Sequence, residues 1–104
     1  MTIVKIPGQT ESSIGKAFVK KVKELNPKLT VWKLSGDGRR DLPDYVCLFC
    51  GLSIFVELKR PGQKPTERQA NKISELQSNG FPASWFDNAE KAATWVTETF
   101  TKIL

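Results

Sequence analysis

The sequence predicts an α/β fold with a mixed four-stranded sheet flanked by helices. Three observations support this class: apolar residues at helical spacing, short runs of strand-forming residues, and the order helix, strand, strand, strand, helix, strand, helix. Successive strands without a helix between them form an antiparallel meander, and a helical crossover makes the fourth strand parallel to the third. We expect residues 1–104 to form a single domain around one core.

The first helix is predicted over TESSIGKAFVKKVKEL, residues 10–25. Lysines occupy one face of this segment, and Asn26-Pro27 is a stop signal because proline cannot continue a helix. The opposite face is apolar at helical spacing, through Ile14, Phe18, Val22 and Leu25.

Three strands are predicted next. LTVWKL, residues 29–34, alternates between apolar and polar residues, and SGDGRRDLP, residues 35–43, is typical of a turn. The apolar runs YVCLF (45–49) and LSIFVELK (52–59) are separated only by Cys50 and Gly51. Two residues are the length of a tight hairpin turn, so these runs are expected to pair.

The C-terminal part predicts a loop, a helix, a strand and a last helix. RPGQKP (60–65) is the loop, and FPASWF (81–86) is the strand. The second helix begins after an N-cap at Thr66, ends before Gly80, and carries Ala70, Ile73 and Leu76. The last helix begins at a capping box of Asp87 and Glu90 and carries Ala92, Trp95, Val96, Phe100 and Ile103. Trp95 and Phe100 are candidates for core or interface positions.

The positive charge is concentrated in the first part of the chain. The net charge is +5, and residues 1–60 hold 11 Lys/Arg against 6 Asp/Glu, whereas residues 61–104 hold 5 of each. This asymmetry favours a polyanionic partner, nucleic acid rather than membrane, although a merely basic soluble surface explains the charge equally well. Neither a secretory signal nor a membrane span is recognisable, so a cytoplasmic location is expected.

Cys47 and Cys50 form a lone C-x-x-C motif. With no histidine and no further cysteine, they cannot complete a four-ligand zinc site. A redox pair is conceivable, but thioredoxin-like motifs open a helix, and this motif lies in a predicted strand and turn. Two small buried side chains are the favoured interpretation.

The hairpin brings charged residues together at one end. If Cys50 and Gly51 form the turn, Asp44 faces Glu57 across the two strands. Opposed like charges are destabilising at this separation, so a compensating group is expected. Alternation places Lys59 on the same face as Glu57.

Two carboxylates and an ammonium at one place suit a hard divalent cation such as Mg²⁺, which takes carboxylate oxygens and keeps positions for water and phosphate. Glu11 is a candidate third acid, because it shares the face that the first helix turns toward the sheet. The simpler alternatives are that Glu11 interacts with the helix dipole, and that Asp44 and Glu57 are strand-end charges bridged to Lys59 or Arg60.

Together these residues resemble the active-site signature of the PD-(D/E)XK nuclease superfamily, with Pro43-Asp44 as PD and Glu57-Leu58-Lys59 as ExK. More narrowly, the chain resembles the virus-type replication-repair nuclease domain, VRR-NUC. Glu11, SGDGRRDLPD, FVELK and Gln69 occur in the order of that family's motifs, across nearly the whole chain. One departure is Asp41-Leu42 before Pro43, where glycine is frequent; Asp41 is either a spectator or a rival of Asp44.

The resemblance implies a restriction-endonuclease-like αβββαβ core followed by a C-terminal helix. It also implies that Asp44, Glu57 and the Leu58 carbonyl hold Mg²⁺ or Mn²⁺, with Glu11 contributing directly or through water. Lys59 would orient or help to deprotonate the attacking water. Gln69 would steady Lys59 or the scissile phosphate, although Thr66 and Gln69 equally fit a helix capping box.

These observations favour a metal-dependent endonuclease that cuts branched DNA such as a Holliday junction or flap. No base-reading module is recognisable, so DNA shape would determine specificity. The resemblance implies a homodimer, and a phage or bacterial origin would suit so compact a nuclease. Predicted phosphate contacts lie in or beside the loops that flank the site: Lys33, Arg39, Arg40, Arg60, Lys64 and Arg68. The alternatives are a non-catalytic nucleic-acid-binding module on the same fold and a redox protein centred on the two cysteines.

Overall fold

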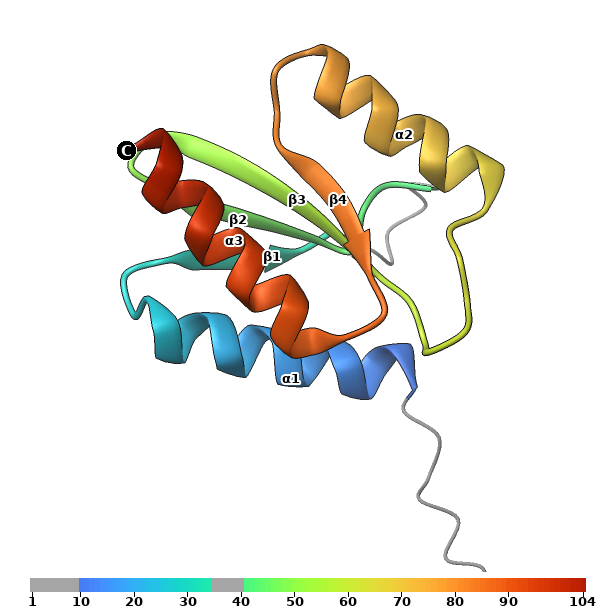
Figure 1. Ribbon diagram of the computed structural model, residues 1–104, viewed down its shortest axis with the longest axis horizontal. Coiled ribbons are helices and arrows are strands. Elements are labelled where there is room, and N and C mark those ends of the chain that lie inside the picture. Colours follow the sequence, from blue (N-terminus) through green and yellow to red (C-terminus); the bar gives the residue numbers. More distant parts are fainter. Residues whose placement is uncertain (1–9, 35–40) are drawn as a thin grey trace, which may run out of the picture.

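The fold is a four-stranded sheet with helices on both faces (Figure 1). The computed structural model describes residues 10–34 and 41–104. Its elements follow the predicted order: α1 (Glu11–Leu25), β1 (Thr30–Lys33), β2 (Tyr45–Phe49), β3 (Leu52–Leu58), α2 (Glu67–Ser78), β4 (Ala83–Phe86) and α3 (Ala89–Ile103). The α/β class and the mixed sheet predicted from the sequence are therefore confirmed.

The sheet has the strand order β1-β2-β3-β4. β1 pairs with β2 and β2 with β3 in antiparallel orientation, whereas β3 and β4 are parallel, as expected for a crossover through α2. The β2–β3 register runs from Phe49 opposite Leu52 to Tyr45 opposite Val56, which is the predicted register. Cys50 and Gly51 form the turn with φ of 50° and 78°, and positive φ at both turn residues is the type I′ requirement.

The core lies between the sheet and the pair α1 and α3, which pack against each other (Figure 1). Ile54, Val56 and Leu58 project from β3 into this layer, where they meet Phe18 of α1 and Val96 of α3. α2 packs on β4, on the other side of the sheet. Every second residue of β3 therefore faces α1 and α3, and the alternate set, which includes Phe55 and Glu57, faces away from them.

Hydrogen bonds at the helix ends explain where the helices begin and end. Thr66 caps α2 as predicted, and Gly80, with φ of 87°, follows its C-terminus with Phe81 N–H donating to the Leu76 carbonyl at 3.0 Å. The predicted cap of α3 was wrong by one residue. Asn88 rather than Asp87 is the N-cap, because its side-chain oxygen accepts the N–H of Lys91 at 2.9 Å.

Three residues predicted on apolar helix faces are exposed. Leu25 and Ile103 are 44% and 48% exposed because they lie in the last turns of α1 and α3, and Ala70 is exposed in the first half of α2. Within the described ranges, the helices are all too short or too polar to cross a lipid bilayer.

Gly15 allows α1 to approach the sheet, and Gly15→Ala is expected to destabilise the protein by about 1–3 kcal/mol. A Cβ at this buried position would collide with the hydroxyl of Tyr45 and lie 3.3 Å from its ring carbon Cζ. Alanine normally stabilises a helix relative to glycine by about 1 kcal/mol. Urea unfolding checks the sign, with Lys16→Ala at the exposed neighbouring position as the control. A stabilised Gly15→Ala protein would contradict this packing.

Candidate active site

The candidate site lies at the end of the β2–β3 hairpin opposite its turn. Continuing the β2–β3 register one pair beyond Tyr45 and Val56 places Asp44 opposite Glu57. The Leu58 backbone N–H donates to Oδ2 of Asp44 at 2.8 Å, which fixes the aspartate against the end of β3. The two acids that the sequence predicted to be neighbours are therefore brought together.

Glu57 is a buried carboxyl group with an unsatisfied oxygen. The residue is only 2% exposed, and its Oε2 has no hydrogen-bond partner in the described part of the chain. Burial raises the pKa of Glu57 from 4.5 to about 9, and the hydrogen bond with Asp44 and the negative charge of Asp44 contribute to this rise. Lys59 acts in the opposite direction. A buried oxygen without a partner is costly, and it is normally satisfied by a hydrogen-bond donor or a bound cation.

Lys59 is the second buried charge of the site. It is 8% exposed, and its Nζ lies 3.6 Å from Oε1 of Glu11, the first residue of α1. The Glu11 side chain is 48% exposed, so this ion pair is open to water on the glutamate side. The structure thus places Glu11 beside the ammonium, where the predicted face of α1 meets the end of β3.

A pocket of about 290 Å³ opens at the site and is lined by Glu11, Ser12, Lys33, Asp44 and Tyr45. Sequence reasoning did not single out Ser12 or Tyr45, although each directly follows a predicted site residue. Burial raises the pKa of the Tyr45 phenol, and Asp44 adds to this shift. A raised pKa favours the neutral phenol, whose hydroxyl can form hydrogen bonds in the pocket.

The donors present fit a divalent cation with few protein ligands. Among residues 10–34 and 41–104, there is no group of three or more Asp, Glu, Cys or His side chains close enough to hold a metal. Glu11, Asp44 and Glu57 thus do not form a three-acid cluster, and neither does half-buried Asp41 join the acidic pair. However, Mg²⁺ commonly uses one or two carboxylates, and the unpartnered oxygen of Glu57 beside Asp44 meets that requirement.

Gln69 takes part in the capping box of α2. Its Oε1 accepts the backbone N–H of Thr66 at 2.9 Å, and the Thr66 hydroxyl accepts the N–H of Gln69 at 3.2 Å. The capping interpretation of the sequence is therefore confirmed. A contribution of Gln69 to Lys59 or to a phosphate stays a prediction.

Four of the predicted phosphate contacts fall in the described ranges, and all four are exposed. Lys33 ends β1 and lines the pocket. Arg60 and Lys64 lie in the segment between β3 and α2, and Arg68 lies in the first turn of α2. Arg39 and Arg40 lie outside the described residues. The described cations are thus available to solvent, and Lys33 is the one that lines the pocket.

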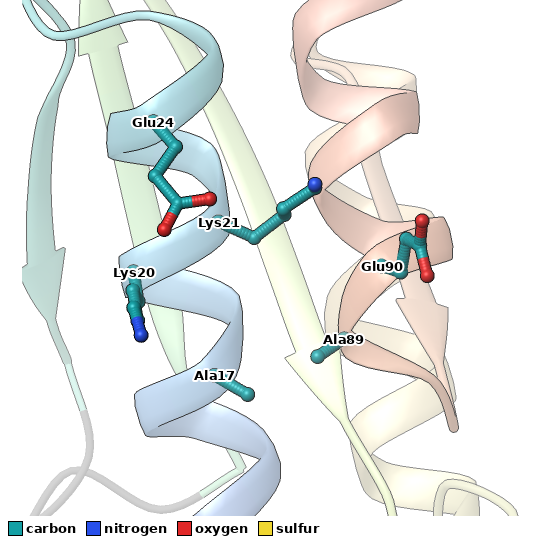
Figure 2. A pocket seen from close by; sticks show the side chains of 6 residues that line it. All are labelled: Ala17, Lys20, Lys21, Glu24, Ala89 and Glu90. Carbon is teal, nitrogen blue, oxygen red and sulfur yellow. The ribbon is translucent and has the colours of Figure 1, made fainter.

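A second hollow, between α1 and α3, is separate from this site. It measures about 300 Å³ and contains side chains of both signs, with Lys21 extending from α1 toward α3 (Figure 2). Its lining residues are Ala17, Lys20, Lys21, Glu24, Ala89 and Glu90. None of them is a predicted site residue, so this hollow does not contribute to the chemistry of the acidic pair.

The two cysteines differ in their environments, and only one was correctly predicted to be buried. Cys47 lies in the core, whereas Cys50 is exposed in the hairpin turn. Burial raises the pKa of Cys47 to about 12, so its reactive thiolate form is disfavoured. This environment does not favour a redox pair.

We expect one thiol of the native protein to react quickly with a thiol reagent at neutral pH and the second to react only after unfolding. Titration with and without denaturant measures both, and a Cys50→Ser variant identifies the fast thiol. Two fast thiols in the native protein would contradict the burial of Cys47.

The chain is similar to a solved structure and to a curated phage protein. No family model matches it. A solved structure described as "VRR_NUC domain" matches with a TM-score of 0.69 at 24% identity, covering 83% of this chain and 92% of that chain. The fold is therefore that of a VRR_NUC domain.

One curated relative is a phage protein. "Putative nuclease p44" of Acyrthosiphon pisum secondary endosymbiont phage 1 is 36% identical over 81 residues, which are 77% of this chain and 85% of the phage protein. The chain belongs to the family of this phage protein, and the VRR-NUC assignment predicted from its motifs is confirmed.

Proposed function

We propose that the protein is a Mg²⁺- or Mn²⁺-dependent endonuclease that hydrolyses phosphodiester bonds in branched DNA. The observation that carries this proposal is the buried carboxyl group of Glu57, with its unpartnered Oε2, beside Asp44. The chain is also related to a phage protein described as a putative nuclease. Two ionised carboxylates this close, one of them buried, repel each other unless a cation compensates them. A divalent ion is the compensating group that also serves phosphodiester hydrolysis.

Asp44 and Glu57 would hold the ion, together with the backbone carbonyl of Leu58. When bound, the ion would supply positive charge to the phosphate and acidify water. Lys59 adds a second, fixed positive charge for the transition state, and its burial strengthens that field. Glu11 holds the ammonium of Lys59 in place from its open side and also reaches the pocket, where it can contact the ion through water.

The surrounding cations would position the DNA backbone. Lys33 lies at the pocket itself, and Arg60, Lys64 and Arg68 follow Lys59 along the chain. Contacts of lysine and arginine with phosphate do not depend on base sequence, so we propose recognition of DNA shape, with a four-way junction or a flap as the substrate. We also propose a homodimer, since two-fold symmetry would match that of a junction.

The test is cleavage of duplex, flap and four-way DNA with Mg²⁺, with Mn²⁺ and with EDTA. We expect cuts in branched substrates that require the ion, and we expect Lys59→Ala to lower the rate about 10²-fold or more, because one charge donor in a water-excluded site has an effect of that size. Lys102→Ala, at an exposed position in the last turn of α3, is the control. Full activity of Lys59→Ala would contradict the role of Lys59.

The alternative function is a nucleic-acid-binding module that keeps the fold and the basic surface without cleaving. A buried Glu57 beside Asp44 is unnecessary for phosphate binding, and two acids at this place oppose the attraction of a polyanion, so the arrangement favours catalysis. Junction DNA that is retained in EDTA and stays intact with Mg²⁺ would favour the module.

A further inference from the structure

Trp85 is the neighbour of Glu57 on the side away from Asp44. The parallel register of β3 and β4 pairs Glu57 with Trp85. Paired residues of adjacent strands project from the same face of a sheet, so the indole and the buried carboxyl group lie next to each other. Asp44, Glu57 and Trp85 thus form a row across three strands, in which Trp85 is about 10 Å from Asp44, two strand spacings away.

The indole of Trp85 is only partly covered. Trp85 is 36% exposed on the edge strand β4, whereas adjoining Glu57 is 2% exposed. Nearby rings are engaged: Phe86 lies 5.4 Å from Trp95 and Phe55 lies 5.8 Å from Phe81, measured between ring centroids. In the described ranges, no such ring pair includes Trp85.

Exposed cations follow the end of β3 along the chain. The N–H of Lys59 donates to the Phe86 carbonyl at 2.9 Å, so the chain leaves the sheet at the end of β4, directly beside Trp85. The next residues include exposed Arg60 and Lys64. An exposed aromatic ring with basic residues beside it is the usual platform for an unstacked base, whose phosphate the cations hold and whose π face stacks on the ring.

We infer that Trp85 is a substrate-positioning residue that stacks on an unpaired base adjoining the scissile phosphate. This inference rests on the proposed nuclease function and narrows its substrate class to DNA with an unpaired nucleotide at the cleavage position. In an intact duplex the bases are stacked on each other, so the platform is usable only where a branch or end frees one. Stacking on Trp85 would then contribute to the selectivity for branched DNA.

Binding is the first test, and it requires no cleavage. The sequence contains 3 tryptophans, so the Trp32→Phe, Trp95→Phe double variant has Trp85 as its one tryptophan, which can be excited apart from Tyr45. In EDTA, a short single-stranded oligodeoxynucleotide should quench its emission with a saturable curve, and a blunt duplex should quench it much less. The Trp85→Phe, Trp95→Phe variant is the control, because its Trp32 is 59% exposed on β1, at the opposite edge of the sheet. Trp32 should not be quenched.

Cleavage of a flap with and without a base at the junction nucleotide is the second test. For the parent protein, an abasic nucleotide should reduce kcat/KM roughly 5- to 150-fold, the value of one stacked base. On the normal flap, the kcat/KM of Trp85→Leu should be lower than that of the parent by the same factor. On the abasic flap, the two proteins should have the same kcat/KM. Trp85→Phe should retain part of the preference for the normal flap. This non-additivity separates stacking from a general disturbance of the fold, which would lower both rates.

The results separate this inference from the proposed function. The stacking role would be overturned if the losses of kcat/KM from Trp85→Leu and from the abasic nucleotide were additive. It would also be overturned if Trp85 stayed unquenched at oligonucleotide concentrations that saturate binding, as measured by fluorescence anisotropy. In that case, loss of cleavage in Glu57→Gln would still support the nuclease. Conversely, quenching of Trp85 by a protein that cleaves no DNA would retain the platform and overturn the nuclease.

Discussion

Glu57→Gln is expected to abolish cleavage of branched DNA, with a decrease in kcat of at least about 10³-fold. The loss of a carboxylate that holds a catalytic ion removes several kcal/mol of charge stabilisation from the transition state. Glutamine has nearly the same volume as glutamate, so it avoids the cavity that alanine would leave at a position only 2% exposed. Single-turnover cleavage of a flap or junction, with saturating Mg²⁺, measures the effect.

Glu98→Gln is the matched control for this substitution. Glu98 is exposed on α3, so the same change of charge and shape should leave cleavage unaltered. Circular dichroism and thermal unfolding of both variants show whether the fold is retained. A folded Glu57→Gln protein that cuts at the parental rate would remove Glu57 from the proposed mechanism.

Without divalent ions, the protein is expected to lose stability steadily as the pH rises from about 5 to about 9. The folded state raises the pKa of Glu57 from 4.5 to about 9, so over this range the folded protein keeps a proton that the unfolded chain has released. The stabilisation is complete below the pKa that Glu57 has in the unfolded chain, and it is lost as the pH rises through the pKa that Glu57 has in the folded protein. The slope approaches about 1.4 kcal/mol per pH unit for one proton.

The absence of histidine from the sequence makes this measurement clean, because few other side chains titrate in that range. Urea unfolding in EDTA at several pH values gives the slope, and Glu57→Gln should flatten it. Mg²⁺ should stabilise the parent more at high pH, since the ion needs the ionised carboxylate. A slope that is unchanged in Glu57→Gln would show that another group is responsible.

Local sequence signals were sufficient to predict the fold and the acidic pair. The two-residue separation of the apolar runs predicted a type of turn that fixes the register, and the register in turn placed Asp44 opposite Glu57. The order of helices and strands followed from periodicity and from stop signals such as Asn26-Pro27. These are short-range properties, so one sequence is enough to read them.

Features that depend on three-dimensional packing were harder to predict. Either Asp87 or Asn88 can cap α3, and only the path of the chain out of β4 decides between them. The contact of Glu11 with Lys59 joins residues far apart in the sequence, and their ion pair was not expected from the pattern. The exposure of Trp85 depends on which strand lies at the edge, which local patterns do not show.

The Cys50-Gly51 turn lies about 20 Å along β2 from the acids whose pairing it determines. A single residue inserted there would slip the strands, swap the inner and outer surfaces of one of them, and carry one acid away from the other. The acidic pair is thus sensitive to an insertion or deletion at a distant tip, while exchanges of Cys50 for residues that tolerate positive φ, such as asparagine or glycine, leave the alignment intact. Among relatives of this chain, substitutions in the two-residue turn should therefore be more frequent than insertions or deletions there.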